Sequence, residues 1–358
     1  MRSVPLLVQL LRQPALAAGF TLADWDLALR QAASARLEAS LLAMLRSAGV
    51  PAALPQQVSA HFIWADVHAA RHGRAVRWEV DRIQAALAGL ELPVILLKGG
   101  AYALSGLAPG QGRMFSDIDI LVPKDMLGPV EAALMMHGWR TTDDDEYNQT
   151  YYRKWMHELP PMQHGQRLSV IDVHHAILPE TAGARPDPAK LRAAAVGIAG
   201  HPGLQMLAPC DMVLHSAVHL FYDGELDHGM RDLLDLHRLL QHFGGDAAFW
   251  AALAPRAQEL EVGRVLFYAL RYCQSILHTP VPAAVQKAAD AARPNALLLA
   301  LMDSLFERVL LPHHPSCNDG FSATARFLLY LRGNWLRMPP LMLARHLAHK
   351  AFLSRKTT

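Results

Sequence analysis

Residues 116–122 of the chain read SDIDILV, and this stretch decides how the middle of the sequence folds. Polar and apolar side chains alternate along it, which is the pattern of a β-strand with one buried face. Because successive side chains of a strand point to opposite faces, Asp117 and Asp119 project together from one face. Ile118 and Ile120 point the other way, into a core. The stretch therefore predicts a strand that presents two carboxylates side by side.

Two carboxylates a few ångströms apart repel each other, and a purely structural strand gains nothing from that arrangement. A divalent cation removes the repulsion. Mg²⁺ suits such a site because it accepts one or two carboxylates and takes its other ligands from water and phosphate oxygens. The alternative is a pair of solvent-facing aspartates at the end of a strand. The neighbouring segments favour the metal site.

The segment before this strand has the features of a phosphate site. Residues 93–98 read PVILLK, which predicts a short buried strand, and Gly99-Gly100 end it before a helix. Glycines let backbone N–H groups approach a phosphate, and a helix start adds the positive end of its dipole. Lys98 or Arg113 can supply charge to a triphosphate. The alternative for the glycines is an ordinary strand-to-helix turn.

A third acid, Asp172, lies on another predicted strand. Residues 168–174 read LSVIDVH, and Asp172 stands between Ile171 and Val173, so its carboxylate can face the same cleft. A carboxylate beside the metal can accept the proton of an attacking hydroxyl or hold a metal ion. The alternative is a buried aspartate paired with an arginine or a backbone N–H.

Four segments carry a resemblance to a known family: Lys98-Gly99, Arg113, residues 116–122 and residues 171–174. Together they look like the uncharacterised nucleotidyltransferase family of bacterial biosynthetic clusters, which belongs to the DNA polymerase beta-like nucleotidyltransferase superfamily. The resemblance covers residues 92–178 well and extends more loosely to about residue 244. It implies a mixed sheet with helices packed on it, two acids on one strand and a third acid on a neighbouring strand.

The resemblance also implies the reaction and its ligands. An acceptor hydroxyl attacks the α-phosphate of a nucleoside triphosphate such as ATP, and pyrophosphate leaves. Two Mg²⁺ ions assist, with Asp117 and Asp119 as metal ligands and Asp172 as third ligand or base. The residues expected at the nucleotide are Lys98, Gly99, Gly100, Arg113 and Ser116.

The phosphate loop departs from the superfamily pattern. The superfamily usually has Gly-Ser at the end of the strand, whereas this chain has Gly99-Gly100 and a long gap before Asp117. A hydroxyl that could contact a phosphate is therefore missing at this position. Its absence supports an alternative function, a nucleotide-binding or regulatory module that keeps the fold but turns over weakly. The three converging carboxylates argue against that alternative, because binding alone does not need them.

The sequence does not identify the acceptor. A sugar, a natural product or a modified peptide is favoured, and a protein side chain or an RNA end remains possible. The nucleotide base is also undetermined, because base contacts in such folds come from variable loops and helices.

The chain divides into three regions that together predict an α+β fold. Residues 1–90 read as helices, residues 91–200 as a small mixed-sheet nucleotidyltransferase core, and residues 201–358 as a helical domain. In the first region the strong helix formers predict helices near residues 24–47 and 56–89. In the third, Leu233, Leu236 and Leu240 recur at helical spacing as a core stripe. Further helices are expected near residues 249–277, 295–310, 323–336 and 341–353.

A second set of metal-type residues lies in the third region. His215 and His219 are four residues apart on one helix face, and acids follow between residues 223 and 235. They offer a metal phosphohydrolase as another function, although no His-Asp doublet appears and 19 histidines make chance pairs common. The Arg231-to-His237 spacing also loosely resembles that of helical ribonuclease toxins.

Composition sets the general class of the protein. A chain of 358 residues with 52% hydrophobic and 18% charged residues is globular rather than disordered, and its net charge of +2 does not indicate a nucleic-acid binder. Three dispersed cysteines predict a reduced, cytoplasmic protein, and no apolar run approaches the roughly 18 residues of a membrane span. Residues 143–146 are interpreted as a solvated acidic loop. Residues 320–358 carry basic side chains and no acid, which fits a solvated helical end or a surface for an anionic partner.

Overall fold

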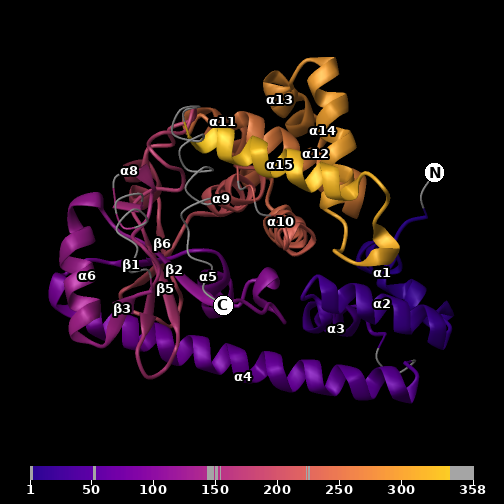
Figure 1. The fold of residues 1–358 in the computed structure, drawn as a ribbon, viewed down its shortest axis with the longest axis horizontal. Helices are drawn as coiled ribbons and strands as arrows, with labels where there is room; N and C mark the ends of the chain where they lie inside the picture. The colour runs from indigo at the N-terminus through magenta and orange to yellow at the C-terminus, as the bar shows by residue number, and fades with distance from the viewer. Residues whose placement is uncertain are drawn as a thin grey trace, which may run out of the picture.

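The computed structural model describes residues 3–50, 54–142, 149, 152–153, 155–222, 224 and 226–338. Within these residues a seven-stranded mixed sheet lies among helices, which confirms the expected α+β fold (Figure 1). None of the helices in this part of the chain is long and apolar enough to cross a membrane.

All three strands expected from the sequence are present: β1 (Val94–Leu96), β2 (Asp117–Leu121) and β5 (Val170–His174). β2 pairs in parallel with β5 and antiparallel with β1, and β1 is buried along its whole length. The full strand order is β3-β4-β5-β2-β1-β7-β6. The strands not foreseen from the sequence are β3 (Trp139–Thr141), β4 (Met162–His164), β6 (Val196–Gly197) and β7 (Leu204–Met206).

The register of β2 and β5 brings the acids to the same level of the sheet. Asp119 lies opposite Asp172, and Asp117 lies opposite Val170. Because side chains alternate along both strands, the three carboxylates share one face. The aliphatic residues between them are buried on the other face, as the alternation predicts.

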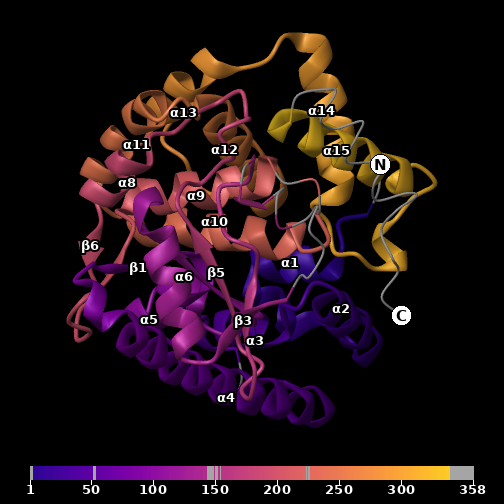
Figure 2. The same ribbon diagram turned by 60° about the vertical axis from the view of Figure 1, so that its left-hand side comes forward.

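Helix α4 (Gln56–Leu87) is 32 residues long and runs along the lower edge of the molecule in Figure 1. It packs on α3 (Glu38–Ser47) and also on α5 (Lys98–Ser105) and α6 (Leu127–Met136), which cover the sheet (Figure 2). It confirms the helix expected near residues 56–89. It also connects the N-terminal helices to the sheet.

The helix expected over residues 24–47 is wrong in one respect, because it consists of two helices, α2 (Leu22–Ser34) and α3. Arg36 lies between them with a φ of 55°. The N–H of Leu37 bonds back to a carbonyl in the last turn of α2 at 2.8 Å, as in a Schellman helix end. Glycine usually occupies the left-handed position of that motif. An arginine occupies it here, so the sequence gives no sign of the break.

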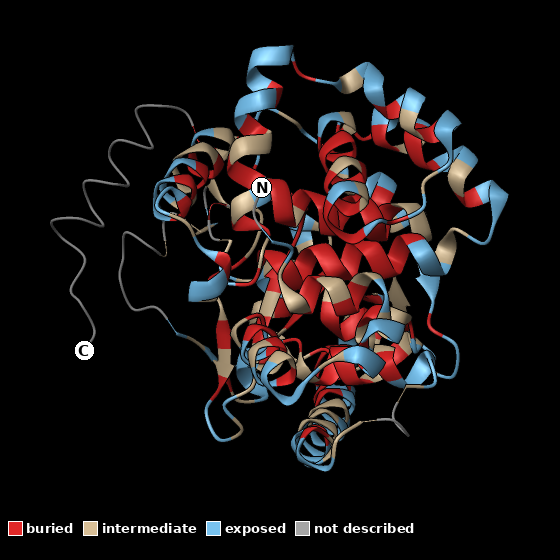
Figure 3. Ribbon diagram, turned by 90° about the vertical axis from the view of Figure 1, so that its right-hand side faces the viewer, coloured by how far each residue is buried: buried red, intermediate tan, exposed pale blue. Residues whose placement is uncertain are grey.

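Helices form the described residues from 209 to 338, apart from short connections. Two of them, α9 (Pro209–Tyr222) and α10 (Gly229–Phe243), are buried along most of their length, and Figure 3 shows buried helices at the centre of the molecule. The core stripe predicted on α10 is confirmed, and the helical stretch near residues 249–277 is divided at Glu261, whose φ is 59°. The remaining helices are α1 (Leu6–Arg12), α8 (Pro188–Ala193), α10 (Gly229–Phe243), α11 (Ala247–Glu259), α12 (Gly263–Leu277), α13 (Ala283–Ala289), α14 (Ala296–Val309) and α15 (Ser322–Arg337). Short 3₁₀ turns are η1 (Pro14–Gly19), η3 (Ala88–Leu90), η4 (Ala108–Gly110), η5 (Lys124–Met126), η6 (Asp290–Ala292) and η7 (Pro315–Cys317).

One hydrophobic cluster extends from Leu7 to Leu329 and takes residues from all three regions expected from the sequence. The division into residues 1–90, 91–200 and 201–358 therefore remains a prediction about sequence character. The acidic run at 143–146, the helix expected near 341–353, the basic residues after 338 and Asp223 lie outside the described residues.

Candidate functional site

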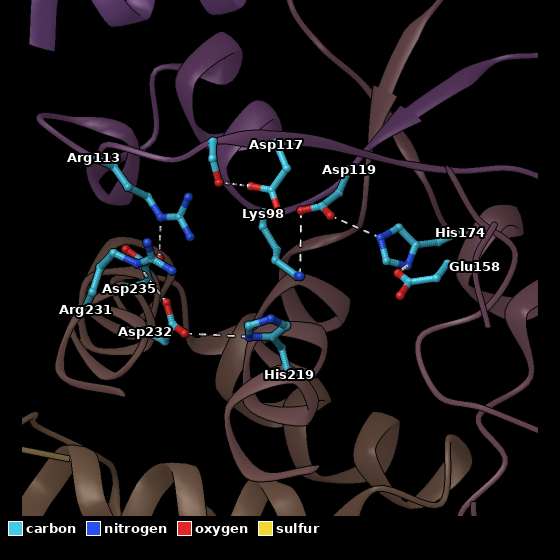
Figure 4. Close-up of polar contacts among 11 residues, drawn as sticks. Lys98, Arg113, Asp117, Asp119, Glu158, His174, His219, Arg231, Asp232 and Asp235 are labelled. Carbon is cyan, nitrogen blue, oxygen red and sulfur yellow. Dashed lines mark hydrogen bonds and ion pairs between the residues drawn. The ribbon is translucent and has the colours of Figure 1, made fainter. Parts of the chain in front are cut away.

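Three carboxylates converge on one face of β2 and β5, and Figure 4 shows two of them, Asp117 and Asp119. One carboxylate oxygen from each of Asp117, Asp119 and Asp172 lies within 4.8 Å of the others. The strands dictate this geometry, because Asp119 and Asp172 are level neighbours and Asp117 precedes Asp119 by one pleat. Asp119 is buried, and the other two are half-buried. The structure thus brings together the three acids that the sequence singled out.

Lys98 is the cation beside these acids. It is the first residue of α5 and has a φ of 39°, so the chain turns sharply from β1 into the helix. Its Nζ lies 3.7 Å from Asp119 Oδ2, and its side chain is largely buried. The start of α5 therefore points an ammonium group and the positive end of a helix dipole toward the carboxylates.

A histidine and a glutamate that the sequence did not identify as site residues complete the group. His174 follows Asp172 by two residues on β5, and its Nε2–H donates to Asp119 Oδ1 at 3.1 Å. Its Nδ1 lies 3.1 Å from Glu158 Oε2, although the two atoms do not form a hydrogen bond. The period-two alternation that selects Asp172 also selects His174. Glu158 reaches the site through an isolated bridge to β5, which no local pattern indicates.

The surroundings move the pKa values of the two facing aspartates in opposite directions. Burial disfavours the charged form of Asp119, but the Lys98 ammonium and the His174 hydrogen bond outweigh it and hold the pKa of this carboxyl well below its usual range. Burial and the nearby charges of Asp119 and Glu158 raise the pKa of Asp172 to about 8. Without a cation, Asp119 is thus ionised and Asp172 protonated at neutral pH.

One oxygen of the acidic group is left without a hydrogen-bond partner. Asp172 Oδ1 is buried and has no hydrogen-bond partner among the described residues. Buried oxygens are nearly always satisfied, so an orphaned one at the centre of an acidic group calls for a ligand. The oxygen-only donor set of Asp117, Asp119 and Asp172 is the one that hard cations such as Mg²⁺ prefer. The residues present fit a divalent cation.

The carboxylates open into a cavity with about 700 Å³ of atom-free space, part of it shared with solvent. One wall is the sheet, and the opposite wall comes from α9. His215, His219 and Tyr222 project into the cavity from that helix, and Arg337 lines it from α15. Cationic and imidazole groups therefore face the acids across a space that can hold phosphate groups.

Arg113, expected at the triphosphate, lies elsewhere. Its side chain is buried at 7% exposure, and its Nε donates to Asp235 Oδ2 on α10 at 2.6 Å. It is not among the described residues that line the acid cavity. A Cβ built on Gly99 would lie 2.3 Å from Arg113 Nη1 and 2.8 Å from a ring atom of Phe115. Gly99 therefore gives room to the packed Arg113 side chain.

The other two residues expected at the nucleotide differ in position. Gly100 is buried, and a Cβ there would make only ordinary contacts with Ile118 and Leu96. Ser116 is exposed, and its hydroxyl lies 3.5 Å from Asp117 Oδ1. Ser116 is thus placed beside Asp117, whereas Gly100 is buried in the first turn of α5.

The residues behind the phosphohydrolase alternative do not assemble into a metal site within the described part of the chain. Two groups there have metal-ligand spacing, the three aspartates and a neighbouring set of His157, Glu158 and His174. Neither contains His215 or His219. The ribonuclease-type pair is also occupied otherwise, because Arg231 pairs with Asp232 and the buried His237 bonds to Thr279.

The sequence of residues 21–278 matches a protein family described as uncharacterised nucleotidyltransferase. The matched region begins in the N-terminal helices, includes the whole sheet and ends just after α12. No curated protein and no solved structure gives a significant match.

Proposed function

The chain belongs to the uncharacterised nucleotidyltransferase family, and from this premise we propose that it transfers a nucleotidyl group from a nucleoside triphosphate, ATP among them, to a hydroxyl of an acceptor in a Mg²⁺-dependent reaction. The single observation that carries the proposal is the convergence of Asp117, Asp119 and Asp172, with a buried Asp172 oxygen that lacks a hydrogen-bond partner among the described residues. A module that only folds or only packs does not need that arrangement.

In this proposal Asp117 and Asp119 are the main metal ligands, and Asp172 is a third ligand or the base. Two Mg²⁺ ions, when bound, supply charge neutralisation for the phosphate oxygens and favour the deprotonated form of the attacking hydroxyl. His174 orients Asp119 through its hydrogen bond, as partners of metal ligands commonly do.

Lys98 and the start of α5 are proposed to bind the triphosphate. The ammonium lies 3.7 Å from Asp119 Oδ2, where it offsets the negative charge. Once a cation takes over that role, the ammonium can pair with a phosphate oxygen of the leaving group. Gly100 and Ser116 border this region, and Arg113 supports it from behind through its contact with Gly99.

The chemical step breaks the bond between the α-phosphorus and the oxygen that bridges to the β-phosphate. The acceptor oxygen forms a bond to the α-phosphorus, and pyrophosphate carries away the bridging oxygen. The acceptor proton passes to the Asp172 carboxylate and then to solvent. The residues mainly position the reactants and neutralise charge, which is how proteins accelerate phosphoryl and nucleotidyl transfer.

The test separates binding from turnover. Calorimetry of ATP, GTP, CTP and UTP with and without Mg²⁺ should show Mg²⁺-dependent binding to the wild type, and the Asp117→Asn/Asp119→Asn double variant should lose it. Pyrophosphate release from labelled nucleotides is then followed across a panel of sugars, aromatic alcohols, peptides and RNA ends. Equal Mg²⁺-dependent binding by wild type and double variant would remove the acids from the nucleotide site.

The alternative with a specific observation behind it is a weakly active nucleotide-binding module. It is favoured by the absence of a hydroxyl at Gly100. The superfamily that the sequence resembles usually has serine at this position. Tight, Mg²⁺-dependent nucleotide binding with no pyrophosphate release from any acceptor class would support that alternative over transfer.

A further inference from the structure

A second cavity adjoins the acids on the side of α4. It lies between that helix and the starts of β2 and β5, where Ile118 lines it from the face of β2 opposite to Asp119. It has about 910 Å³ of atom-free space, part of it shared with solvent. Asp117 lines both this cavity and the acid cavity. Moving along β2 toward its start, one passes Asp119 beside Lys98, then Asp117, then Ser116 at the second cavity. Lys98 thus lies beside Asp119, and the second cavity adjoins the acid cavity at Asp117.

Three aromatic rings, those of His72, Trp78 and Phe115, line the second cavity together with aliphatic and polar side chains. Trp78 projects from α4 with 50% of its surface exposed. His72, which precedes Trp78 by six residues on α4, packs edge-on against Phe115 with ring centroids 4.7 Å apart. A flat, half-exposed indole is a surface on which a planar ring can stack.

The second cavity carries little charge for a phosphate to bind. Arg167 is the cation among its described lining residues, and Glu79 holds its guanidinium with contacts of 2.7 and 3.0 Å. The same guanidinium lies over the rings of Trp78 and Trp139. Burial, followed by the charge of Arg113, lowers the pKa of His72, so that its ring is neutral. The acid cavity differs, because Lys98 and Arg337 face the acids there, so it is both more charged and more polar than the second cavity.

We propose that the second cavity binds the acceptor, and that the acceptor presents an uncharged aromatic ring next to its hydroxyl. This inference rests on the proposed function. In nucleotidyl transfer the attacking and leaving oxygens lie roughly in line on opposite sides of the phosphorus. With the leaving pyrophosphate on the Lys98 side, the acceptor hydroxyl arrives from the Asp117 and Ser116 side. An aromatic natural product or a tyrosine-bearing peptide fits these walls, whereas the phosphate backbone of an RNA end does not.

The experiment measures binding of three neutral aromatic alcohols, 2-naphthol, 2-phenylethanol and N-acetyltyrosinamide, with methyl glucoside as the non-aromatic alcohol. Titrations are done by ligand-observed NMR on the full chain, with and without Mg²⁺ and a non-hydrolysable ATP analogue. Trp78→Ala should weaken aromatic binding about tenfold, since stacking on one indole contributes about that factor. Its binding of Mg²⁺ and the ATP analogue should stay unchanged.

Trp64→Ala is the matched control. Trp64 lies on the same helix, is 69% exposed and does not line the second cavity. This variant should bind both ligand classes like the wild type. Trp78→Ala should also keep its melting temperature, because Glu79 and Trp139 still hold Arg167.

Three results would overturn the inference. The first is aromatic binding that is equal in Trp78→Ala and wild type or absent from both. The second is preferential binding of methyl glucoside. In the third, Trp78→Ala weakens the ATP analogue and not the aromatic alcohols, which would make the second cavity the base pocket. If the wild type does not bind the ATP analogue in the presence of Mg²⁺, the proposed function fails instead. The titrations without nucleotide still test aromatic binding, so failure of the proposed function and failure of the acceptor inference can be distinguished.

Discussion

Two clusters of charged side chains lie next to each other in Figure 4, and they differ in whether their charges are satisfied. On α10, Asp235 pairs with Arg113 at 2.6 Å and Asp232 pairs with Arg231 at 3.0 Å, and all of these residues are buried. On β2 and β5, three aspartates share one lysine and one histidine, and Asp172 Oδ1 lacks a partner among the described residues.

The comparison teaches how to separate structural from functional charge in one fold. Buried acids matched one-to-one with arginines have their hydrogen bonds met inside the protein, so they need nothing from outside. Acids in excess of their cations repel one another, and a bound cation lowers that repulsion. The two clusters should therefore respond in opposite ways to the same kind of substitution.

The largest effect is expected for Asp172→Asn, which keeps the size of the side chain and removes its charge. Turnover should fall by roughly 10²–10⁴-fold, as for loss of a general base or metal ligand. The melting temperature of the metal-free protein should not fall, since burial opposes the Asp172 charge in the first place. Single-turnover rate and melting temperature are measured on one preparation. A stable variant with an unchanged rate would place Asp172 outside the reaction.

Asp235→Asn should give the reverse result. It leaves the Arg113 guanidinium buried without its carboxylate, which costs about 3–5 kcal/mol of unfolding free energy. Folded material should still bind Mg²⁺ and ATP with wild-type affinity. Denaturant unfolding and calorimetry give the two readouts, and the Arg113→Met/Asp235→Leu double variant should regain most of the stability. Nucleotide binding that fails in a well-folded variant would return Arg113 to the triphosphate, as the sequence suggested.

His174 connects structural and functional charge, because it is buried and donates a hydrogen bond to the Asp119 carboxylate. His174→Ala should raise the Mg²⁺ concentration needed for half-maximal nucleotide binding about 10–100-fold, the usual effect of losing a partner of a metal ligand. His174→Gln keeps an N–H donor and should recover most of the loss. If alanine and glutamine behave alike, the hydrogen bond to Asp119 is not what positions the carboxylate.

The smallest expected effect is a proton released when the metal binds. With its pKa raised to about 8, Asp172 is protonated at pH 7 in the metal-free protein and must ionise to serve a cation. Its folded pKa lies above the unfolded value of about 3.9, so its contribution to stability is full below pH 4 and is lost as pH rises toward 8. Calorimetry of Mg²⁺–ATP binding in buffers of different ionisation enthalpy should detect up to one proton at pH 7. Asp172→Asn should show none.

Local sequence patterns predict most of the candidate site, whereas contacts between distant parts of the chain cannot be predicted from them. The alternation in β2 and β5 predicts the strands, the shared face of Asp117 and Asp119, and the position of Asp172. It cannot identify the partner of Arg113, because Asp235 lies 122 residues further along the chain. The same limit hides Glu158, which reaches His174 through an isolated bridge. The helix break at Arg36 escapes prediction for a different reason, since a non-glycine residue adopts a left-handed backbone there.

The parallel pairing of β2 with β5 also has a consequence for how the protein folds. Asp119 and His174 are 55 residues apart, so the site forms only when a long loop closes, which is a slow class of folding event. The helices are built from local contacts and can form earlier. In refolding experiments we therefore expect far-ultraviolet circular dichroism to recover before Mg²⁺-dependent nucleotide binding does. Nucleotide and metal should then stabilise the finished protein by mass action without speeding its formation.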